Sequence, residues 1–320
     1  MNNVKINSKK LGLAWRTLGN PNFGAPAALL ILYVANALLT PRFATVSNTL
    51  NMLLQMSTTM IVAVGMTFVI ASRGIDLTVG STMALVSIIV ALFIKYGMAI
   101  AILASLGSAL LIGLLNSFLI SRLKLDPLIT TLAALIIWRG VAQVIGDGEI
   151  VPFAHPTFEA LGKGYLGAIP IQVVIAGVVV VAAFFCIHST LFGRYIVAVG
   201  GNEQAARLAG IRAERVKSIV YMISALLAGL AGLIETARLA IGDPSKIGVN
   251  AEFDAIAAVV VGGTPFSGGR ANVLGTVVGV LIMQVISTSF NMLLIPFTWS
   301  LVLKSVIILF AVFLQRHQEV

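Results

Sequence analysis

Long apolar runs, separated by short polar segments, extend over most of the chain. Most of these runs hold 17 residues or more, and about 20 helical residues cross the roughly 30 Å hydrocarbon core of a membrane. The pattern predicts an all-α polytopic membrane protein with about ten transmembrane segments, some of them short or broken. We place the segments at 24–40, 51–72, 80–96, 98–121, 128–146, 169–187, 218–238, 253–263, 272–292 and 297–314. The run at 253–263 is too short to cross alone, and we expect it to be re-entrant or broken.

Basic residues are unevenly distributed between the predicted spans, and this bias sets the orientation of a membrane protein. Ten crossings that start inside put the N- and C-termini in the cytoplasm, with 1–23 as a cytoplasmic N-terminal segment before a retained first helix. Fourteen Lys and Arg residues then lie inside and five outside, and the reverse orientation would invert the bias. The inside residues are Lys5, Lys9, Lys10, Arg16, Arg73, Arg122, Lys124, Arg194, Arg207, Arg212, Arg215, Lys217, Arg270 and Arg316, and the outside residues are Arg42, Lys95, Lys163, Arg238 and Lys246.

Composition narrows the class of protein. Charged residues make up only 10% of the chain and the mean hydropathy is +1.02, which excludes an ordinary soluble domain. The net charge of +9 lies in short loops, so it indicates membrane orientation rather than nucleic-acid binding. The one cysteine, Cys186, falls in an apolar run and the three histidines are scattered, so we expect neither an intrachain disulfide nor a metal site.

Two predicted loops are longer than the others. The outer loop, 147–168, contains three acidic residues, and the inner loop, 188–217, is basic. The inner loop contains the stretch GGNEQAARLAGI at 200–211, which is polar although most of the chain is apolar. A polar, self-contained stretch in an inner loop indicates a function on the cytoplasmic side.

This stretch predicts a short helix over residues 203–209. Asn202 is a suitable N-cap, and Gly210 suits the left-handed position after the last turn. A helix of this length is marginal alone, so we expect something else to hold it. Its small apolar face fits either a groove on a partner protein or the membrane surface, and is formed by Ala205, Leu208 and Ala209.

A seven-residue pattern occurs twice, as Gly74–Gly80 and as Gly263–Gly269. Both copies fall at predicted cytoplasmic turns, where glycine lets the backbone turn and lets helices approach closely. They are either traces of an internal repeat whose broken helices flank a pathway or two unrelated turns. Asp76 in the first copy is a candidate either for capping the helix that begins near Thr78 or for contacting a substrate.

Polar side chains within apolar spans are costly and are candidates for function. Amides suit the several weak contacts that a polyhydroxylated solute makes, so Asn116, Gln284 and Asn291 are candidate pathway residues. Arg139 and Lys304 also fall within spans, where they could snorkel to lipid headgroups.

Three long stretches carry a family resemblance: VGMTFVIASRGIDLTVGS at 64–81, FGRYIVAVGGNEQAARLAGI at 192–211 and EFDAIAAVVVGGTPFSGGR at 252–270, followed by LGTVVGV at 274–280. In order and length they resemble the signature segments of the ribose-type permeases of ATP-binding-cassette (ABC) importers, which serve ribose, xylose, arabinose or galactose. The resemblance covers nearly the whole chain. Gln204 stands where the general loop pattern has Glu, so Glu203 would supply the charge in a different register.

The resemblance implies one permease domain over 1–320, with 188–217 as its coupling loop, in a bacterial inner membrane. Two permease subunits, identical or paralogous, would form the pathway for a monosaccharide delivered by a periplasmic binding protein. A separate ABC ATPase would bind ATP and Mg²⁺, because this chain has no Gly-x-x-x-x-Gly-Lys-(Ser/Thr) loop; we expect no bound cofactor and no enzyme activity of its own. The residues expected to dock in a groove of the ATPase and couple it to the permease are Asn202, Glu203, Ala205, Ala206, Leu208, Ala209 and Gly210.

Three other classes compete with this interpretation. A secondary transporter driven by an ion gradient would need paired carboxylates or a proton relay in mid-span, and the sequence pattern does not indicate one. A channel or structural membrane protein would leave the capped inner helix unexplained. An intramembrane enzyme would need a cluster of catalytic side chains or metal ligands, and none is evident.

Overall fold

The computed structural model describes residues 21–316. Most of the predicted N-terminal segment 1–23, including Lys5, Lys9, Lys10 and Arg16, lies outside the described residues. Each of the ten predicted segments corresponds to a helix, with boundaries that differ by a few residues. These helices are α2 (Pro21–Leu39), α3 (Val46–Ala71), α4 (Val79–Phe93), α5 (Met98–Ser117), α6 (Pro127–Ile145), α8 (Ile171–Ser189), α11 (Ala213–Leu239), α12 (Ala251–Val261), α13 (Val273–Met292) and α14 (Phe297–Arg316).

The described helices confirm a polytopic membrane protein. Seven helical segments within 21–316 are long and apolar enough to cross a membrane, namely 46–71, 79–96, 98–122, 127–145, 171–189, 213–239 and 273–292. A 3₁₀ turn at Ile94–Tyr96 extends α4, and a π-helical turn at Phe118–Arg122 extends α5. As predicted, α12 is too short to cross a membrane alone, because its 11 residues span only about 16 Å of a hydrocarbon core of roughly 30 Å.

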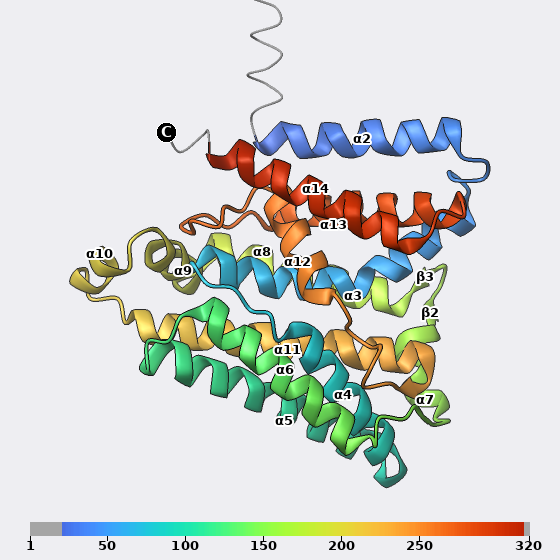
Figure 1. Ribbon diagram of the computed structural model, residues 1–320, viewed down its shortest axis with the longest axis horizontal. Coiled ribbons are helices and arrows are strands. Elements are labelled where there is room, and N and C mark those ends of the chain that lie inside the picture. The colour runs from blue at the N-terminus through green and yellow to red at the C-terminus, as the bar shows by residue number, and fades with distance from the viewer. Residues whose placement is uncertain (1–20, 317–320) are drawn as a thin grey trace, which may run out of the picture.

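Short elements mark the two ends of the helix bundle (Figure 1). One end, here called the α10 end, carries α9 (Leu191–Gly201) and α10 (Glu203–Leu208). The opposite end, the α7 end, carries α7 (Pro156–Lys163) and two small antiparallel strand pairs that the sequence did not predict. These pairs join β1 (Val151–Pro152) to β4 (Ile241–Gly242) and β2 (Tyr165–Leu166) to β3 (Ile169–Pro170).

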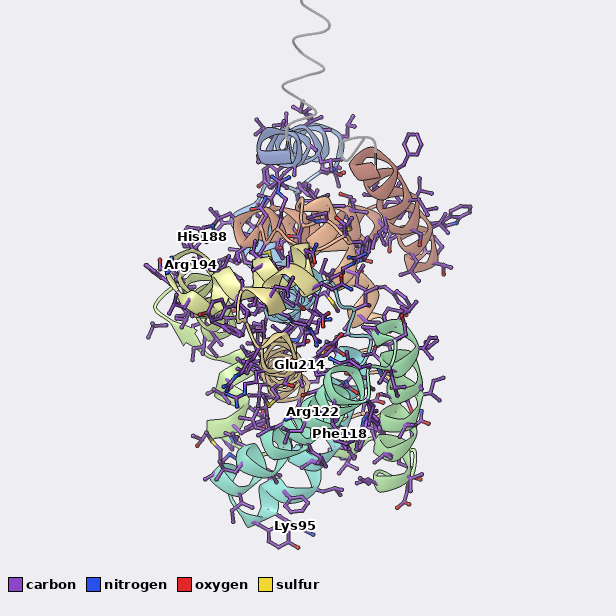
Figure 2. All side chains as sticks on the ribbon, turned by 90° about the vertical axis from the view of Figure 1, so that its left-hand side faces the viewer. Lys95, Phe118, Arg122, His188, Arg194 and Glu214 are labelled. Carbon is purple, nitrogen blue, oxygen red and sulfur yellow. The ribbon has the colours of Figure 1, made fainter. Side chains whose placement is uncertain are left out.

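The predicted inner and outer loops lie at opposite ends of the bundle. The beginning of α2 and the end of α14 are both at the α10 end (Figure 1). Figure 2 looks onto that end, where Arg122, Arg194 and Glu214 are labelled. Lys124, between α5 and α6, forms an ion pair of 3.0 Å with Glu214 there. Arg122, Lys124, Arg194, Arg207 and Lys217, all predicted to lie inside, are therefore at one end of the bundle.

Helix α3 lies at the centre of the bundle. Every residue from Met60 to Ala71 is buried, and α3 packs against α11, α12, α13 and α8. Close packing depends on small residues: a Cβ on Gly65 would lie 3.2 Å from the Cα of Ser224 on α11. The peripheral helices α5, α6 and α8 instead expose apolar side chains outward, such as Leu103, Ile136 and Val178, which suits contact with lipid.

Two spans are interrupted inside the molecule. Residues 72–78 return from the end of α3 into the interior before α4 begins, and residues 243–250 enter from the α7 end before α12 begins. The two interruptions meet, since a Cβ on Gly80 would lie 2.2 Å from the carbonyl oxygen of Gly248. From this point α4 runs to the α7 end, whereas α12 runs away from it, toward α13 and α14 (Figure 1).

The structure contains an internal repeat, but its two halves do not correspond through the two glycine-rich segments as predicted. The order of a long helix, an interrupted short helix and two further helices occurs as α3–α6 and again, in the opposite direction, as α11–α14. The structural counterpart of the first glycine segment is 243–250, not Gly263–Gly269. The prediction that both glycine copies lie at surface turns fits only the start of the first copy: the adjoining Arg73 is exposed and lies against Gly268, whereas Asp76 and Gly80 are buried inside the bundle. The prediction assumed that α4 starts at the membrane surface, whereas α4 starts inside the bundle.

Candidate transport cavity and docking helix

A cavity of about 500 Å³ lies between α3, α13 and the interrupted span before α12. Its lining residues on α3, α11 and α13 fall in the parts of those helices toward the α7 end, so the cavity lies in that half of the bundle. The lining residues are Gln55, Thr58, Thr59, Val62, Met83, Glu235, Arg238, Lys246, Gly248, Val249, Ala251, Asp254, Gln284, Ser287, Asn291 and Lys304.

One wall of the cavity is polar and uncharged. Gln284 on α13 donates to the side-chain oxygen of Gln55 on α3 at 3.2 Å and to the hydroxyl of Thr288 at 3.1 Å. Thr59 on α3 and Asn291 on α13 continue this wall. Amides and hydroxyls both donate and accept, so the wall can exchange hydrogen bonds with the hydroxyls of a small solute.

The other wall carries charges. Lys304 on α14 is 6% exposed and pairs with Asp254 on α12 at 2.8 Å. On α11 a carboxylate oxygen of Glu235 lies 3.7 Å from a guanidinium nitrogen of Arg238. Lys246, from the segment before α12, also lines this wall. Of the alternatives for Lys304, the structure does not support snorkelling to lipid headgroups, because its ammonium group finds a carboxylate on a neighbouring helix inside the bundle.

Arg139 also has partners inside the molecule and does not reach for headgroups. From α6 its guanidinium donates to the carbonyl oxygens of Pro244 (3.2 Å), Ile247 (2.7 Å) and Gly248 (3.2 Å). The buried carboxylate of Glu252 lies on the same side, beside Gly80. Arg139 therefore holds the interrupted segment 243–250, part of which forms the cavity wall.

The predicted pathway residues fall into three places. Gln284 and Asn291 line the cavity. Gly74, Asp76, Gly80 and Asn116 are buried and do not line it, whereas Gly263 and Gly269 are half-buried at the α10 end. All of these pathway residues were predicted from polarity and glycine content alone. Neither property indicates which face of a helix points into the cavity.

Asp76 has a structural environment. Its carboxylate accepts from the amide of Thr78 at 3.0 Å, the hydroxyl of Thr78 at 2.6 Å and the hydroxyl of Ser224 at 2.8 Å. Asn116 donates to the same Thr78 hydroxyl at 2.9 Å. Of the two roles proposed for Asp76, the structure supports the contact to the beginning of α4, since the side chain is 0% exposed.

The short helix in the inner loop forms as predicted. The side chain of Asn202 accepts from the amide of Ala205 at 3.0 Å, and Gly210 has a φ of 84° after the last turn. Leu208 is 92% exposed, and Ala205 and Ala209 are exposed beside it. The helix therefore presents an apolar side chain, flanked by small ones, away from the rest of the molecule.

Ala206 does not belong to the exposed face with which it was grouped. It is only 5% exposed and packs into the central cluster of buried side chains. Consecutive helical residues point about 100° apart, so Ala206 faces inward while Ala205 faces outward. We therefore remove Ala206 from the residues expected to touch a partner.

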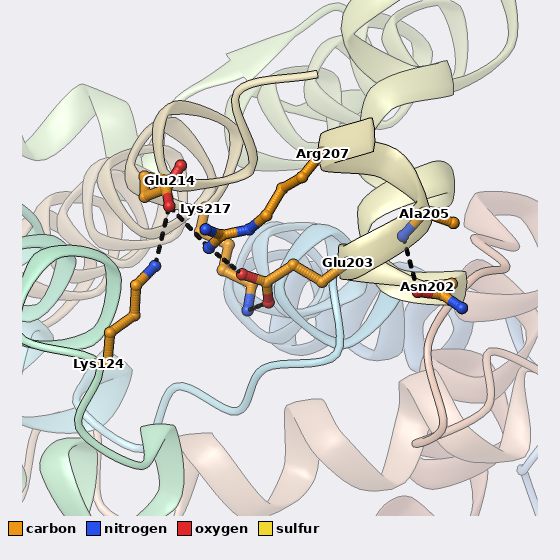
Figure 3. A network of polar contacts seen from close by, with 7 residues as sticks. All are labelled: Lys124, Asn202, Glu203, Ala205, Arg207, Glu214 and Lys217. Atoms are coloured by element: carbon orange, nitrogen blue, oxygen red, sulfur yellow. Dashed lines mark hydrogen bonds and ion pairs between the residues drawn. The ribbon is translucent and has the colours of Figure 1, made fainter. Parts of the chain in front are cut away.

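Charged side chains attach α10 to the bundle (Figure 3). Glu203 pairs with Arg207 and with Lys217 on α11, and Arg207 also pairs with Glu214. Partial burial opposes the charged form of Glu203, but hydrogen bonds from Lys217 and Arg207 outweigh it and lower the pKa of this carboxyl. Glu203 thus has partners within this chain, rather than being free to replace the missing acid at position 204.

The sequence reasoning missed several cavity residues. On α13, Gln284, Ser287 and Asn291 recur at helical spacing, and on α3 Gln55 and Thr59 are four residues apart. This periodicity was available and would have identified one polar stripe per helix. Asp254 could not have been found in this way, because its importance comes from Lys304, 50 residues away.

Comparison with known proteins identifies the family. Residues 48–312 match the family described as the branched-chain amino acid transport system / permease component. The chain belongs to this family of permeases. The ribose import permease protein of Escherichia coli is 39% identical over 298 residues, which cover 91% of this chain and 92% of that protein.

Other relatives have similar names. The ribose import permease protein of Bacillus subtilis is 40% identical over 295 residues, covering 91% of each chain. The L-arabinose transport system permease protein of Escherichia coli is 34% identical over 299 residues, covering 93% of this chain and 91% of that protein. No solved structure matches at a significant level. The predicted resemblance to ribose-type sugar permeases is confirmed.

Proposed function

We propose that this chain is the membrane subunit of an ABC importer that carries a monosaccharide into a bacterial cell. The likeness to a ribose import permease over nine-tenths of both chains carries the proposal. The uncharged wall with Gln55, Gln284 and Asn291 supports it, because several hydrogen bonds of about 1 kcal/mol each can hold a sugar and still release it.

The partners follow from the two ends of the bundle. A periplasmic sugar-binding protein delivers the sugar at the α7 end, and an ABC ATPase that binds ATP and Mg²⁺ docks at the α10 end. A second permease subunit, identical or paralogous, completes the pathway in the inner membrane. The Lys and Arg bias supports this orientation, because Arg122, Lys124, Arg194, Arg207 and Lys217 lie at the α10 end.

The docking of the ATPase is tested at Leu208. Leu208→Asp places a charge at the exposed large apolar side chain of α10, and an unpaired charge in an apolar groove should weaken assembly at least about tenfold. Leu166→Asp, at an exposed position of the α7 end, is the matched control. The measurements are co-purification of the ATPase and uptake of labelled ribose and arabinose. Wild-type assembly and uptake with Leu208→Asp would contradict the docking assignment.

The orientation is tested separately. In a Cys186→Ala background, single cysteines at Glu203 and Glu159 should react with an impermeant maleimide from opposite sides of sealed cells. Labelling of both from one side would contradict the arrangement. Sugar uptake that follows an ion gradient and needs no ATPase would favour a secondary transporter instead.

A further inference from the structure

The carbonyl oxygen of Ala71, at the last residue of α3, is enclosed by two glycines from distant parts of the chain. The amide of Gly269 donates to it at 3.0 Å. A Cβ on Gly200, in α9, would lie 1.8 Å from the same oxygen and 2.7 Å from the Gly269 nitrogen. No side chain larger than hydrogen fits at Gly200, so three backbone segments are in direct contact. We call this contact the Ala71 joint.

The Ala71 joint is next to the docking helix. Gly200 is two residues before Asn202, the N-cap of α10. Ile196 and Val199, on the same helix as Gly200, are buried in the cluster that contains the end of α3. A displacement of α10 therefore reaches Gly200 through Asn202, the single extended residue between α9 and α10.

On its other side the joint leads to the cavity. Helix α3 is continuous from Val46 to Ala71, and its residues Gln55, Thr59 and Val62 line the cavity. Val62 and Ala71 are nine residues apart, or about 13 Å along the axis. The helix is unbroken and every residue from Met60 to Ala71 is buried, so a shift at Ala71 moves Val62 and the cavity wall with it.

We propose that the Ala71 joint, formed with Gly200 and Gly269, transmits movement of α10 to the α3 wall of the cavity. Backbone contacts suit this role, because they contain no rotatable side chain that could absorb a shift. Gly200 is then a positioning residue, acting through α3 and not by contact with the sugar. The inference rests on the proposed function, since it assumes that an ATPase moves α10.

The test compares two adjacent glycines of α9. Gly200→Ala forces the joint apart, whereas a Cβ on Gly201 meets only the Cα of Gly269 at an ordinary 3.8 Å, so Gly201→Ala is the matched control. The reporter is Thr59→Cys in a Cys186→Ala background, in the complete complex in vesicles. Its rate of labelling by an impermeant maleimide is measured with and without ATP and Mg²⁺.

We expect ATP to change the labelling rate of the reporter, and Gly200→Ala to reduce that change at least about fivefold, the lower range of allosteric coupling. Gly201→Ala should keep the change. ATPase co-purification should be normal in both variants, and ATP hydrolysed per sugar imported should rise only with Gly200→Ala. An unaltered labelling response in an assembled Gly200→Ala complex would overturn the inference.

A milder variant covers the case in which Gly200→Ala does not accumulate. A Cβ on Gly269 would lie 2.8 Å from the Cα of Gly201, and Gly269→Ala should reduce the labelling response. Gly167→Ala controls for positive φ alone, because its Cβ meets nothing within 4 Å. A wild-type response with Gly269→Ala would also overturn the inference. If the unaltered reporter complex binds no ATPase, the proposed function fails instead.

Discussion

Residues 72–78 and 243–250 both bring the chain into the interior before a short helix, and they meet at Gly80 and Gly248. The first segment is held by buried side chains: Asp76 accepts three hydrogen bonds from Thr78 and Ser224, and Asn116 donates to the Thr78 hydroxyl. The second is held from outside, by the guanidinium of Arg139 on its backbone carbonyls. Only the second contributes to the cavity.

The two segments have similar backbones, but this difference gives the first a structural role and the second a role in transport as well. A buried polar network keeps its segment in one position, and every partner it satisfies is one fewer group for a solute. In the second segment Asp243 is buried and accepts from the amides of Ser245 and Lys246, whereas the side chains of Lys246 and Val249 face the cavity. Mutations in the first segment should therefore act on folding, and those in the second on transport as well.

The largest effect is expected where the two segments meet. Gly80→Leu would place its Cβ 2.2 Å from the carbonyl oxygen of Gly248 and 2.4 Å from a carboxylate oxygen of Glu252. Such overpacking should cost at least about 3 kcal/mol. We expect low abundance in the membrane and a lower midpoint of thermal unfolding in detergent. Gly140→Leu, where a Cβ meets nothing within 4 Å, is the control. Normal abundance of Gly80→Leu would show that the segments do not meet.

Arg139→Met should have the next largest effect. It keeps the apolar stem but leaves three carbonyls without their donor and removes the cation beside Glu252, a loss of about 3 kcal/mol or more. Stability and sugar uptake should both fall. The stability and uptake of Arg139→Lys should lie between those of the wild type and Arg139→Met, since an ammonium cannot match the fork of a guanidinium. Full uptake with Arg139→Met would remove the distinction between the segments.

Asp76→Asn should affect stability alone. The substitution keeps the shape but replaces charge-assisted hydrogen bonds to Thr78 and Ser224, at a cost of about 1–3 kcal/mol. The variant should unfold at a lower temperature, while the protein that remains folded imports sugar with an unchanged KM. A changed KM at normal stability would place Asp76 in the pathway after all.

Lys246→Gln should have the smallest effect on stability and a measurable effect on transport. Its side chain is exposed, so the free energy of unfolding should change by less than about 0.5 kcal/mol. Replacement of a charge-assisted hydrogen bond to the solute by a neutral one should raise KM for uptake about two- to tenfold. Lys95→Gln, at the same end but outside the cavity lining, is the control. An unchanged KM would limit the charged wall to a structural role.

Features that depend on a few neighbouring residues could be predicted from the sequence. All ten apolar runs are helices, because a run of apolar residues specifies its own length and environment. The cap by Asn202 and the left-handed Gly210 were also predictable, since a helix end is set by residues within one turn. Gln284 and Asn291 were identified as candidate pathway residues by their polarity within an apolar span, and both line the cavity.

Features that depend on partners distant in the sequence were decided by tertiary structure. Lys304 meets Asp254 and not a lipid headgroup, and Arg139 meets carbonyls more than 100 residues away. The inward position of Ala206 and the true counterpart of the first glycine segment follow from helix packing in the same way. By itself the sequence determined where helices form and how they end, because local hydrogen bonds and apolar periodicity are sufficient for that. Which polar groups line a cavity and which satisfy each other is a property of pairs, and only the packing of the helices brings those pairs together.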